Sequence, residues 1–257
     1  MIKIINVPAF QDNYLWLFHR SGSNSTYVVD PGDAAPIEDA LRQHRLNLEG
    51  ILVTHHHADH IGGIAALRQH RDIPVYGPRS ERIPMVTHTL SDGDHLQLAQ
   101  GFCFQVMAVP GHTLDHIAYF EPTEAVLFCG DTLFAAGCGR MFEGNPTQMQ
   151  ASLQKLAELP PQTAVYCAHE YTSANLKFAA AVEPGNRSIL HRIEVTQRLR
   201  QAARPTVPST IDEELLTNPF LRVREDTVIS AASGYTAQKL GSPAEVFAAL
   251  RGWKDNF

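Results

Sequence analysis

The sequence predicts an α/β layered domain followed by an all-α region, and three observations support this. Short runs rich in β-branched and aromatic residues recur through the first two-thirds of the chain, closed by turn formers such as Pro31-Gly32 and Pro110-Gly111. A few helical periods lie between these runs, and after about residue 173 only helical periods remain. We therefore expect helices outside paired sheets over residues 1–173 and a helical subdomain over residues 174–257.

The predicted strands are short and bounded by glycine, proline, asparagine or aspartate. Residues 1–8 already have a strand-like pattern. Further strands are expected at 13–18, 25–30, 50–54, 95–99, 102–109, 116–120, 125–129 and 163–168.

Helices are expected at 36–45, 61–70 and 146–159 in the layered domain, and at 174–182, 188–204, 211–217 and 244–250 beyond it. Ser188 and Ser242 are candidate N-caps, because a short hydroxyl side chain accepts hydrogen bonds from the first backbone N–H groups. Pro243 then takes a first-turn position, where its missing N–H is not needed.

The composition is that of a globular protein, with 44% apolar and 19% charged residues among 257. No apolar run approaches the ~20 residues that span a bilayer, so no membrane segment is expected. The net charge of −6 argues against a nucleic-acid partner held by a broad basic surface. The first residues lack the pattern of a secretory signal, and we expect a cytoplasmic protein.

The four cysteines, Cys103, Cys129, Cys138 and Cys167, are widely spaced and form no C-x-x-C pair. This spacing favours neither a disulfide framework nor a zinc knuckle. We expect buried free thiols.

Four candidate metal ligands lie within six residues: His55, His57, Asp59 and His60. They follow an apolar strand and precede a helical period, so they occupy a strand-to-helix turn, where several side chains can converge. His55 and His57 alternate in an extended backbone and point to the same side, whereas His56 points away and is assigned no metal role. The pattern predicts two groups of donors for two neighbouring metals.

Imidazole and carboxylate donors without thiolate favour a catalytic site for zinc, with iron or manganese as alternatives. Three further candidates, His112, Asp131 and His169, each follow a predicted strand. Taken singly, each is also typical of an ordinary loop residue or helix cap. Together they complete the donor set of a two-metal site. The competing interpretation of the His-rich run, an exposed polar loop, is disfavoured by the number of ligands.

The His-x-His-x-Asp-His run with the three later donors resembles the metallo-β-lactamase superfamily, and more narrowly the hydroxyacylglutathione hydrolase (glyoxalase II) family. The resemblance continues through 7–14, 130–134, 137–140, 168–172, 175–178, 183–186 and 218–220. The His run is typical of the whole superfamily. The Gly137-Cys138-Gly139-Arg140 loop, the run at 168–172 and the helical C-terminus are typical of the narrower family.

The resemblance implies a four-layer αββα sandwich with a binuclear metal site at one edge. It assigns the seven donors to two divalent metals. The first metal is held by His55, His57 and His112. The second is held by Asp59, His60 and His169, and Asp131 bridges the two. Asp30 would orient a ligand histidine from behind.

The activity implied is hydrolysis of S-(2-hydroxyacyl)glutathione, such as S-D-lactoylglutathione, to glutathione and D-lactate in methylglyoxal detoxification. Two metals generate a nucleophile from water and polarise the carbonyl. The catalytic candidates are Asp59, which is placed to accept a proton, and the bridging Asp131. The leaving thiolate, whose conjugate acid has a pKa of about 8.5, needs little general-acid help.

Glutathione carries two carboxylates, and the chain offers separated polar and basic groups to hold it. The substrate-binding candidates are Arg140, Tyr171, Asn175, Lys177, Arg251 and Lys254. For Arg251 and Lys254 the residues alone favour solvated cations near a helix C-terminus. Their substrate role therefore depends on the resemblance.

Two residues depart from the family pattern. Asp115 stands where glycine is usual, and Phe142 stands where many members have tyrosine. Neither is a metal ligand, so the departures bear on substrate affinity rather than on reaction type.

Other activities remain open on the same fold, namely lactone hydrolysis and glutathione-persulfide oxygenation with one metal. A non-catalytic metal-dependent binding protein would be expected to have lost ligands. The complete second donor set favours hydrolysis. We expect a monomer with a small-molecule thioester substrate.

Overall fold

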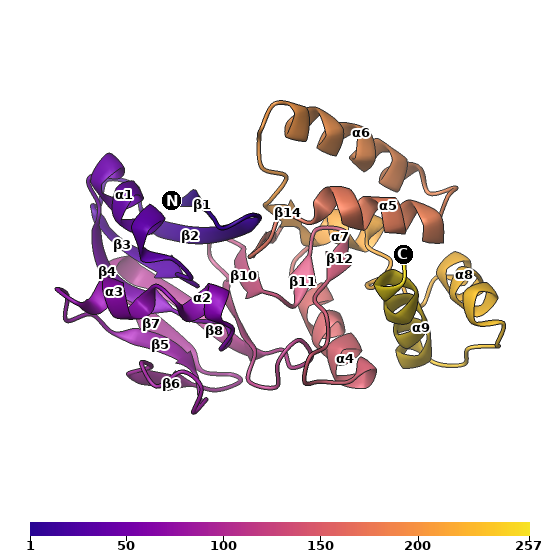
Figure 1. The fold of residues 1–257 in the computed structure, drawn as a ribbon, viewed down its shortest axis with the longest axis horizontal. Coiled ribbons are helices and arrows are strands. Elements are labelled where there is room, and N and C mark those ends of the chain that lie inside the picture. Colours follow the sequence, from indigo (N-terminus) through magenta and orange to yellow (C-terminus); the bar gives the residue numbers. More distant parts are fainter. The chain divides into compact units, whose positions relative to one another are not determined.

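The computed structural model describes all residues, 1–257, and contains two compact units (Figure 1). Unit 1 comprises residues 1–108 and 115–130, and unit 2 comprises residues 109–114 and 131–257. The predicted boundary near residue 173 marks a different division, where strands give way to helices, and it stays a prediction.

Unit 1 contains a mixed sheet with the strand order β1-β2-β3-β4-β5-β6. Its strands are β1 (Ile2–Ala9), β2 (Asn13–Arg20), β3 (Ser25–Val29), β4 (Asn47–Leu52), β5 (Val75–Pro78) and β6 (His88–Leu90). The first three strands are antiparallel, and β3 to β6 run parallel. Parallel neighbours need a crossover, and the crossovers carry α1 (Ala34–His44), α2 (Ala58–Ile61) and α3 (Ile64–Arg68).

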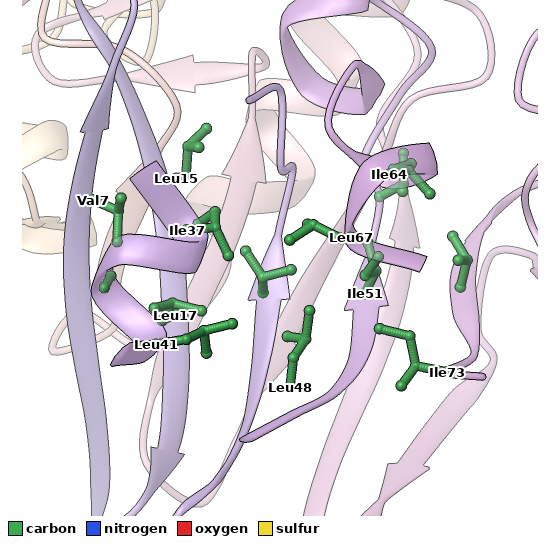
Figure 2. Close-up of a cluster of buried hydrophobic side chains, with 14 of the residues drawn as sticks. Val7, Leu15, Leu17, Ile37, Leu41, Leu48, Ile51, Ile64, Leu67 and Ile73 are labelled. Atoms are coloured by element: carbon green, nitrogen blue, oxygen red, sulfur yellow. The ribbon is translucent and has the colours of Figure 1, made fainter. Parts of the chain in front are cut away.

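Aliphatic side chains fill the layer between this sheet and its helices (Figure 2). Ile37 of α1 and Leu67 of α3 are fully buried against Leu17, Val28 and Ile51 of the strands. Burial of each such side chain stabilises the fold by about 1.5–3 kcal/mol. This apolar layer holds the ends of β3 and β4, where the polar loops of the candidate site begin.

A second set of strands in unit 1 packs on the other face of the first sheet. It consists of β7 (His95–Leu98), β8 (Phe102–Ala108), β9 (Ile117–Glu121) and β10 (Val126–Gly130), all antiparallel neighbours, with the 3-10 turn η1 (Ala99–Gly101) between β7 and β8. Phe18 of β2 contacts the rings of Phe102, Phe104 and Phe128 at centroid distances of 5.2 to 5.4 Å. Unit 1 is thus built of helices, sheet and sheet in successive layers.

Unit 2 is mainly helical. It contains a hairpin of β11 (Leu133–Phe134) and β12 (Gly137–Cys138), and the antiparallel pair β13 (Ala164–Cys167) and β14 (Ser209–Thr210). Its helices are α4 (Pro146–Ala157), α5 (Thr172–Val182), α6 (Arg187–Gln201), α7 (Ile211–Thr217), α8 (Asp226–Thr236) and α9 (Pro243–Asp255). No helix of the chain combines the length and the apolar character needed to cross a membrane.

Two helix predictions need correction. The N-cap of α6 is Asn186 rather than Ser188, because the Asn186 side chain accepts from the N–H groups of Ser188 and Ile189. The helical period predicted at 61–70 is divided into α2 and α3 at Gly62-Gly63. The Gly63 N–H there donates to the Pro31 carbonyl at 2.8 Å and not to a helical partner.

Helix α8 was not predicted, because its serines, threonines and glycine are weak helix formers. A tertiary contact supports it, since the Tyr235 ring stacks on Trp253 of α9 at 5.0 Å. The predicted cap of α9 is confirmed: Ser242 accepts from the Glu245 N–H in a capping box, and Pro243 occupies the first turn.

The prediction of free cysteines is confirmed. Cys129, Cys138 and Cys167 are buried, and Cys103 is partly exposed. Burial raises the pKa of the Cys138 thiol to about 11 and that of Cys167 to about 12. These two thiols are therefore protonated at neutral pH.

Candidate metal centre

The His-rich run lies in unit 1 between the end of β4 and the short helix α2. Val53 and Thr54 continue β4 as buried residues, and His57 is the N-cap of α2. Gly32 makes this arrangement possible, because a Cβ there would lie 1.8 Å from the Asp59 carbonyl oxygen. The Pro31-Gly32 turn after β3 thus presses directly against the start of α2.

The four donors of unit 1 form two close pairs. His55 Nε2 lies 3.1 Å from His57 Nδ1, as expected from their alternation in an extended backbone. His60 Nε2 lies 3.6 Å from Asp59 Oδ2. The His55 ring also lies 4.1 Å from the His60 ring, so the four side chains form one cluster, and their division between two metals stays a prediction.

Asp30 is the buried anchor of these donors. Its Oδ2 lies 3.0 Å from His60 Nδ1 and accepts from Thr54 Oγ1 at 2.7 Å, and its Oδ1 accepts from the Thr54 N–H at 2.7 Å. Thr54 Oγ1 in turn lies 3.0 Å from His55 Nδ1. Asp30 thus contacts His60, a candidate ligand, and Thr54 extends this contact to His55, whereas the ligand roles themselves stay predictions.

Two residues of this region were missed by sequence reasoning. Asn13 at the start of β2 donates from Nδ2 to Asp59 Oδ2 at 2.9 Å, and the buried His116 ring stacks on His55 at 4.6 Å. Asn13 lies inside the run 7–14 that carries the family resemblance, whereas His116 lies in none of the runs given for it. For Asn13 the resemblance was the available signal, and for His116 there was none, because neither residue is near its partner in sequence.

His56 is directed away from the donor pairs, as predicted. Its Nδ1 lies 3.0 Å from both carboxylate oxygens of Asp115, and its Nε2 lies 2.8 Å from Arg82 Nη1. Asp115, which departs from the family pattern, is therefore the hydrogen-bonding partner of His56.

In unit 2, two histidines converge on one carboxylate oxygen of Asp131. His112 Nε2 lies 3.4 Å and His169 Nε2 lies 3.3 Å from Asp131 Oδ2. All three side chains are buried. The three donors come from distant positions of the sequence and form a compact set within this unit.

A backbone carbonyl orients His112. Its Nδ1 lies 2.7 Å from the carbonyl oxygen of Arg140. Gly139 allows this approach, because a Cβ there would lie 1.9 Å from the Asp131 carbonyl oxygen and 3.2 Å from His112 Nδ1. The glycine-rich loop thus allows the close approach of Asp131 and His112, and it supplies a backbone carbonyl that faces His112 Nδ1.

The donor chemistry and its surroundings fit a divalent metal. The donors are imidazoles and carboxylates, the set that suits zinc, iron or manganese. His55, His60 and His112 each direct Nδ1 at an oxygen partner, so that Nε2 faces the other donors. Metal-ligating histidines almost always have such a partner on the second ring nitrogen.

Exposed aromatic rings cover two of the histidines in unit 2. Tyr171, which is 36% exposed, stacks in parallel on His169 at 4.8 Å. Phe142, which is 64% exposed, meets the edge of His112 at 5.3 Å. Tyr171 thus lies beside the candidate ligand His169. Phe142, which departs from the family pattern, places an apolar ring beside the candidate ligand His112.

The three predicted carboxylate-binding cations gather around Asp255 at the end of α9. Arg251 is only 5% exposed and donates to Asp255 Oδ1 at 2.8 Å and to the Cys138 carbonyl at 3.2 Å. The Arg140 side chain is 71% exposed, and its Nε lies 4.0 Å from Asp255 Oδ1. Lys254 Nζ donates to the Ala174 carbonyl at 3.3 Å. Burial, and next the charge of Arg251, lower the pKa of Lys254 to about 8.

The remaining two substrate-binding candidates lie on α5. Asn175 is buried, and its Nδ2 donates to the Ala135 carbonyl at 3.0 Å. Lys177 is exposed. The Asn175 side chain therefore holds the β11–β12 hairpin.

Comparisons with known proteins match the whole chain. The family model described as "Metallo-beta-lactamase superfamily" matches residues 10–169, and that described as "Hydroxyacylglutathione hydrolase C-terminus" matches residues 170–257. A hydroxyacylglutathione hydrolase of Pseudomonas aeruginosa is 53% identical over 259 residues, covering 100% of both chains.

Solved structures with the same fold include BLEG-1, a B3 metallo-beta-lactamase, with a TM-score of 0.63 and 27% identity over 86% of this chain and 99% of that one. TTHA1623 in a di-iron-bound form has a TM-score of 0.61 and 25% identity over 85% of this chain and 100% of that one. These matches confirm the predicted αββα fold class with its C-terminal helical region.

Proposed function

Because the chain belongs to the hydroxyacylglutathione hydrolase family of the metallo-beta-lactamase superfamily, we propose that it hydrolyses the thioester of S-(2-hydroxyacyl)glutathione. The products are glutathione and a 2-hydroxy acid, which is D-lactate when the substrate is S-D-lactoylglutathione. The observation that carries this proposal is the 53% sequence identity, over the full length of both chains, to a hydroxyacylglutathione hydrolase. It includes the helical C-terminus, for which a separate family model exists.

The superfamily match and the His and Asp donors support a divalent metal site. We propose two metals, with zinc first and iron or manganese as alternatives. The proposed ligands are His55, His57, Asp59 and His60 of unit 1 and His112, Asp131 and His169 of unit 2. What supports this assignment is the donor chemistry of each unit and the oxygen partners behind the histidines.

Two divalent ions held by these residues would lower the pKa of water towards ~7 and polarise the scissile carbonyl. The side chains of the protein fix where this chemistry takes place. Asp131 faces both His112 and His169 through one oxygen, which suits a bridging carboxylate. Asn13 orients Asp59 by a hydrogen bond to Oδ2, and Asp59 is the proposed proton acceptor.

The leaving group determines how much acid catalysis is needed. A thiolate whose conjugate acid has a pKa of about 8.5 departs at neutral pH with little help from a general acid. An amide would need a stronger proton donor. The donor set is therefore better suited to a thioester than to a peptide bond.

We propose that the carboxylates of the glutathione moiety meet Arg140, Arg251 and Lys254. Their common neighbour Asp255 holds Arg251 in place and leaves most of the Arg140 side chain exposed. The proposed role of Tyr171 is a phenolic hydrogen bond to the same carrier, and its exposed ring beside His169 supports this. Asn175 and Lys177 remain weaker candidates. The predicted cytoplasmic location and monomeric state stay predictions.

The test is a thioester hydrolysis assay on the purified, metal-loaded protein, combined with metal analysis. We expect release of free thiol from S-D-lactoylglutathione and two metal equivalents per chain. A lactone and a lactoyl thioester of a small neutral thiol serve as comparison substrates. Two bound metals without turnover of the glutathione thioester would contradict the proposed substrate, and faster turnover of the lactone would favour the alternative reaction.

A further inference from the structure

The β11–β12 hairpin lies between one proposed ligand of unit 2, Asp131, and the Arg140 backbone carbonyl that orients another, His112. Asp131 lies two residues before β11, and Gly139 and Arg140 follow β12 directly. The Gly139 N–H donates to the Thr132 carbonyl at 3.2 Å, and the Arg140 carbonyl orients His112. Any shift of the hairpin would therefore move the Asp131 backbone and the acceptor behind His112 together.

The hairpin adopts a conformation that its own sequence does not favour. Its two-residue loop is Ala135-Ala136, and Ala136 has a φ of 56°. A residue with a Cβ pays a steric cost in this left-handed region, and glycine or asparagine is the usual choice. Both alanines are buried. The loop needs support from the surrounding structure.

Glu214 of α7 supplies this support from a fully buried position, with 0% exposure. Its Oε2 accepts from the Ala136 N–H at 2.8 Å and from Asn218 Nδ2 at 2.8 Å. Its Oε1 accepts from Arg192 Nη2 at 2.6 Å and from Ser209 Oγ at 2.5 Å. Four donors and one positive charge thus satisfy the buried carboxylate, as burial of a charge requires.

Two buried amides bind three carbonyls of the hairpin backbone. Asn218 Nδ2 lies 2.9 Å from the Gly137 carbonyl oxygen and 3.2 Å from that of Phe134. Asn175 Nδ2 donates to the Ala135 carbonyl at 3.0 Å. The hairpin is therefore held through its backbone by side chains of α5, of α7 and of its C-cap Asn218, with Glu214 at the centre of the network.

We infer that Glu214 is a positioning residue for the metal centre, acting through the hairpin on Asp131 and His112. This inference rests on the proposed function only in taking Asp131 and His112 as metal ligands. The hydrogen-bond partners of the Glu214 carboxylate are Ala136, Asn218, Arg192 and Ser209, none of which is a proposed metal ligand. Glu214 holds the strained turn in place, and the turn sets the distance between a carboxylate donor and the carbonyl that orients an imidazole donor.

Two substitutions test position separately from charge. Glu214→Gln keeps the shape and removes the charge, which leaves Arg192 without its buried carboxylate. Glu214→Asp keeps the charge beside Arg192 but shortens the side chain by one methylene, which withdraws it from the Ala136 N–H. Loss of a group that orients metal ligands typically weakens metal binding 10- to 100-fold. We expect both variants to bind Zn²⁺ about 10- to 100-fold more weakly and to show an altered visible spectrum with Co²⁺.

Glu213→Gln is the matched control. Glu213 precedes Glu214 on the same helix, has a side chain 45% exposed, and lies 3.3 Å from Arg192 and 3.1 Å from Ser209. The Glu213→Gln substitution removes one negative charge from the same network. It leaves the hydrogen bond to the hairpin intact, because the Ala136 N–H donates to Glu214. We expect wild-type Zn²⁺ affinity and a wild-type Co²⁺ spectrum for this variant.

The measurements are competition with a chromophoric chelator for Zn²⁺ affinity, the Co²⁺ spectrum, and far-ultraviolet circular dichroism for folding. A folded Glu214→Gln or Glu214→Asp protein with wild-type affinity and spectrum would overturn the inference. An equal loss in Glu213→Gln would overturn it in favour of a general charge effect, and unfolding of both Glu214 variants would overturn it in favour of a purely structural role. Because the readout is metal binding, a wild-type protein without thioesterase activity would count against the proposed substrate and not against Glu214.

Discussion

The two units build their donor sets in opposite ways. In unit 1 the four donors follow one another within six residues, and a side-chain carboxylate, Asp30, lies behind His60. In unit 2 the donors His112, Asp131 and His169 come from distant loops, and a backbone carbonyl, that of Arg140, lies behind His112.

The difference shows how each set resists disturbance. When all donors of a group lie in one turn, their geometry depends on few residues, namely the turn itself and the residue that anchors it, here Asp30. A dispersed group depends on every element that places its loops, here including the β11–β12 hairpin and the Glu214 network. We therefore expect changes near Asp30 to act on metal binding directly, and changes in unit 2 to act at long range.

Replacing Asp131 with alanine should have the largest effect, because it removes the carboxylate shared by the dispersed set. Metal catalysis contributes several kcal/mol of transition-state stabilisation, so kcat should fall by roughly 10³-fold or more. The measurements are kcat and metal content. If Asp131→Ala retained two tightly bound metals and near-normal kcat, the unit 2 donor set would be wrongly assigned.

Replacing Asp30 with asparagine tests the compact set. Asparagine tolerates the left-handed backbone of this position, where φ is 50°, but it lacks one of the carboxylate oxygens that hold His60 and Thr54. We expect metal affinity to fall about 10- to 100-fold, measured by chelator competition. Asp33→Asn, in the same turn, keeps the N-cap of α1 and should bind metal normally. Equal affinities for the two variants would contradict the anchoring role.

The pH dependence of substrate binding tests Lys254. Its pKa of about 8 means that the folded protein loses this charge as pH rises through 8, whereas an unfolded chain keeps it up to about 10.4. The KM for a glutathione thioester should therefore rise by up to about tenfold between pH 7 and pH 9, because one charge-assisted contact is lost. In Lys254→Arg the charge persists, and KM should stay flat.

The control for Lys254 is a thioester of a small neutral thiol, whose KM should not follow this pH profile. A parallel rise for both substrates would place the titrating group elsewhere. The same pKa has a consequence for stability. Between pH 8 and about 10.4 the unfolded chain binds more protons at Lys254, so this residue's contribution to the free energy of unfolding increases with pH.

Replacing His56 with alanine should have the smallest effect on the centre. The ring nitrogens of His56 are directed at Asp115 and Arg82, and its contact with His57 is a ring edge at 5.0 Å. We expect an unchanged metal stoichiometry, measured by elemental analysis, and at most a modest loss of stability. Loss of one metal equivalent would show that the alternation of His55, His56 and His57 has been assigned in the wrong register.

Local patterns were enough to predict most helices and strands of the molecule. Ile211–Thr217 forms the predicted helix at its predicted bounds, and Ser242 and Pro243 begin α9 as expected. The prediction was wrong where local signals were weak or misleading. Asn186 competes with Ser188 for the cap of α6, and α8 has the composition of a poor helix former.

The sequence alone was enough to predict the candidate donors, the strand-to-helix turn that carries four of them and, through family resemblance, the fold class. Only the tertiary structure brought Asn13 to Asp59, Glu214 to the Ala136 N–H, and Arg251 to the Cys138 carbonyl. The physical reason is the range of the interactions. Periodicity and capping depend on neighbours within one or two turns, whereas a buried polar group takes any partner that the packed chain places within hydrogen-bond distance.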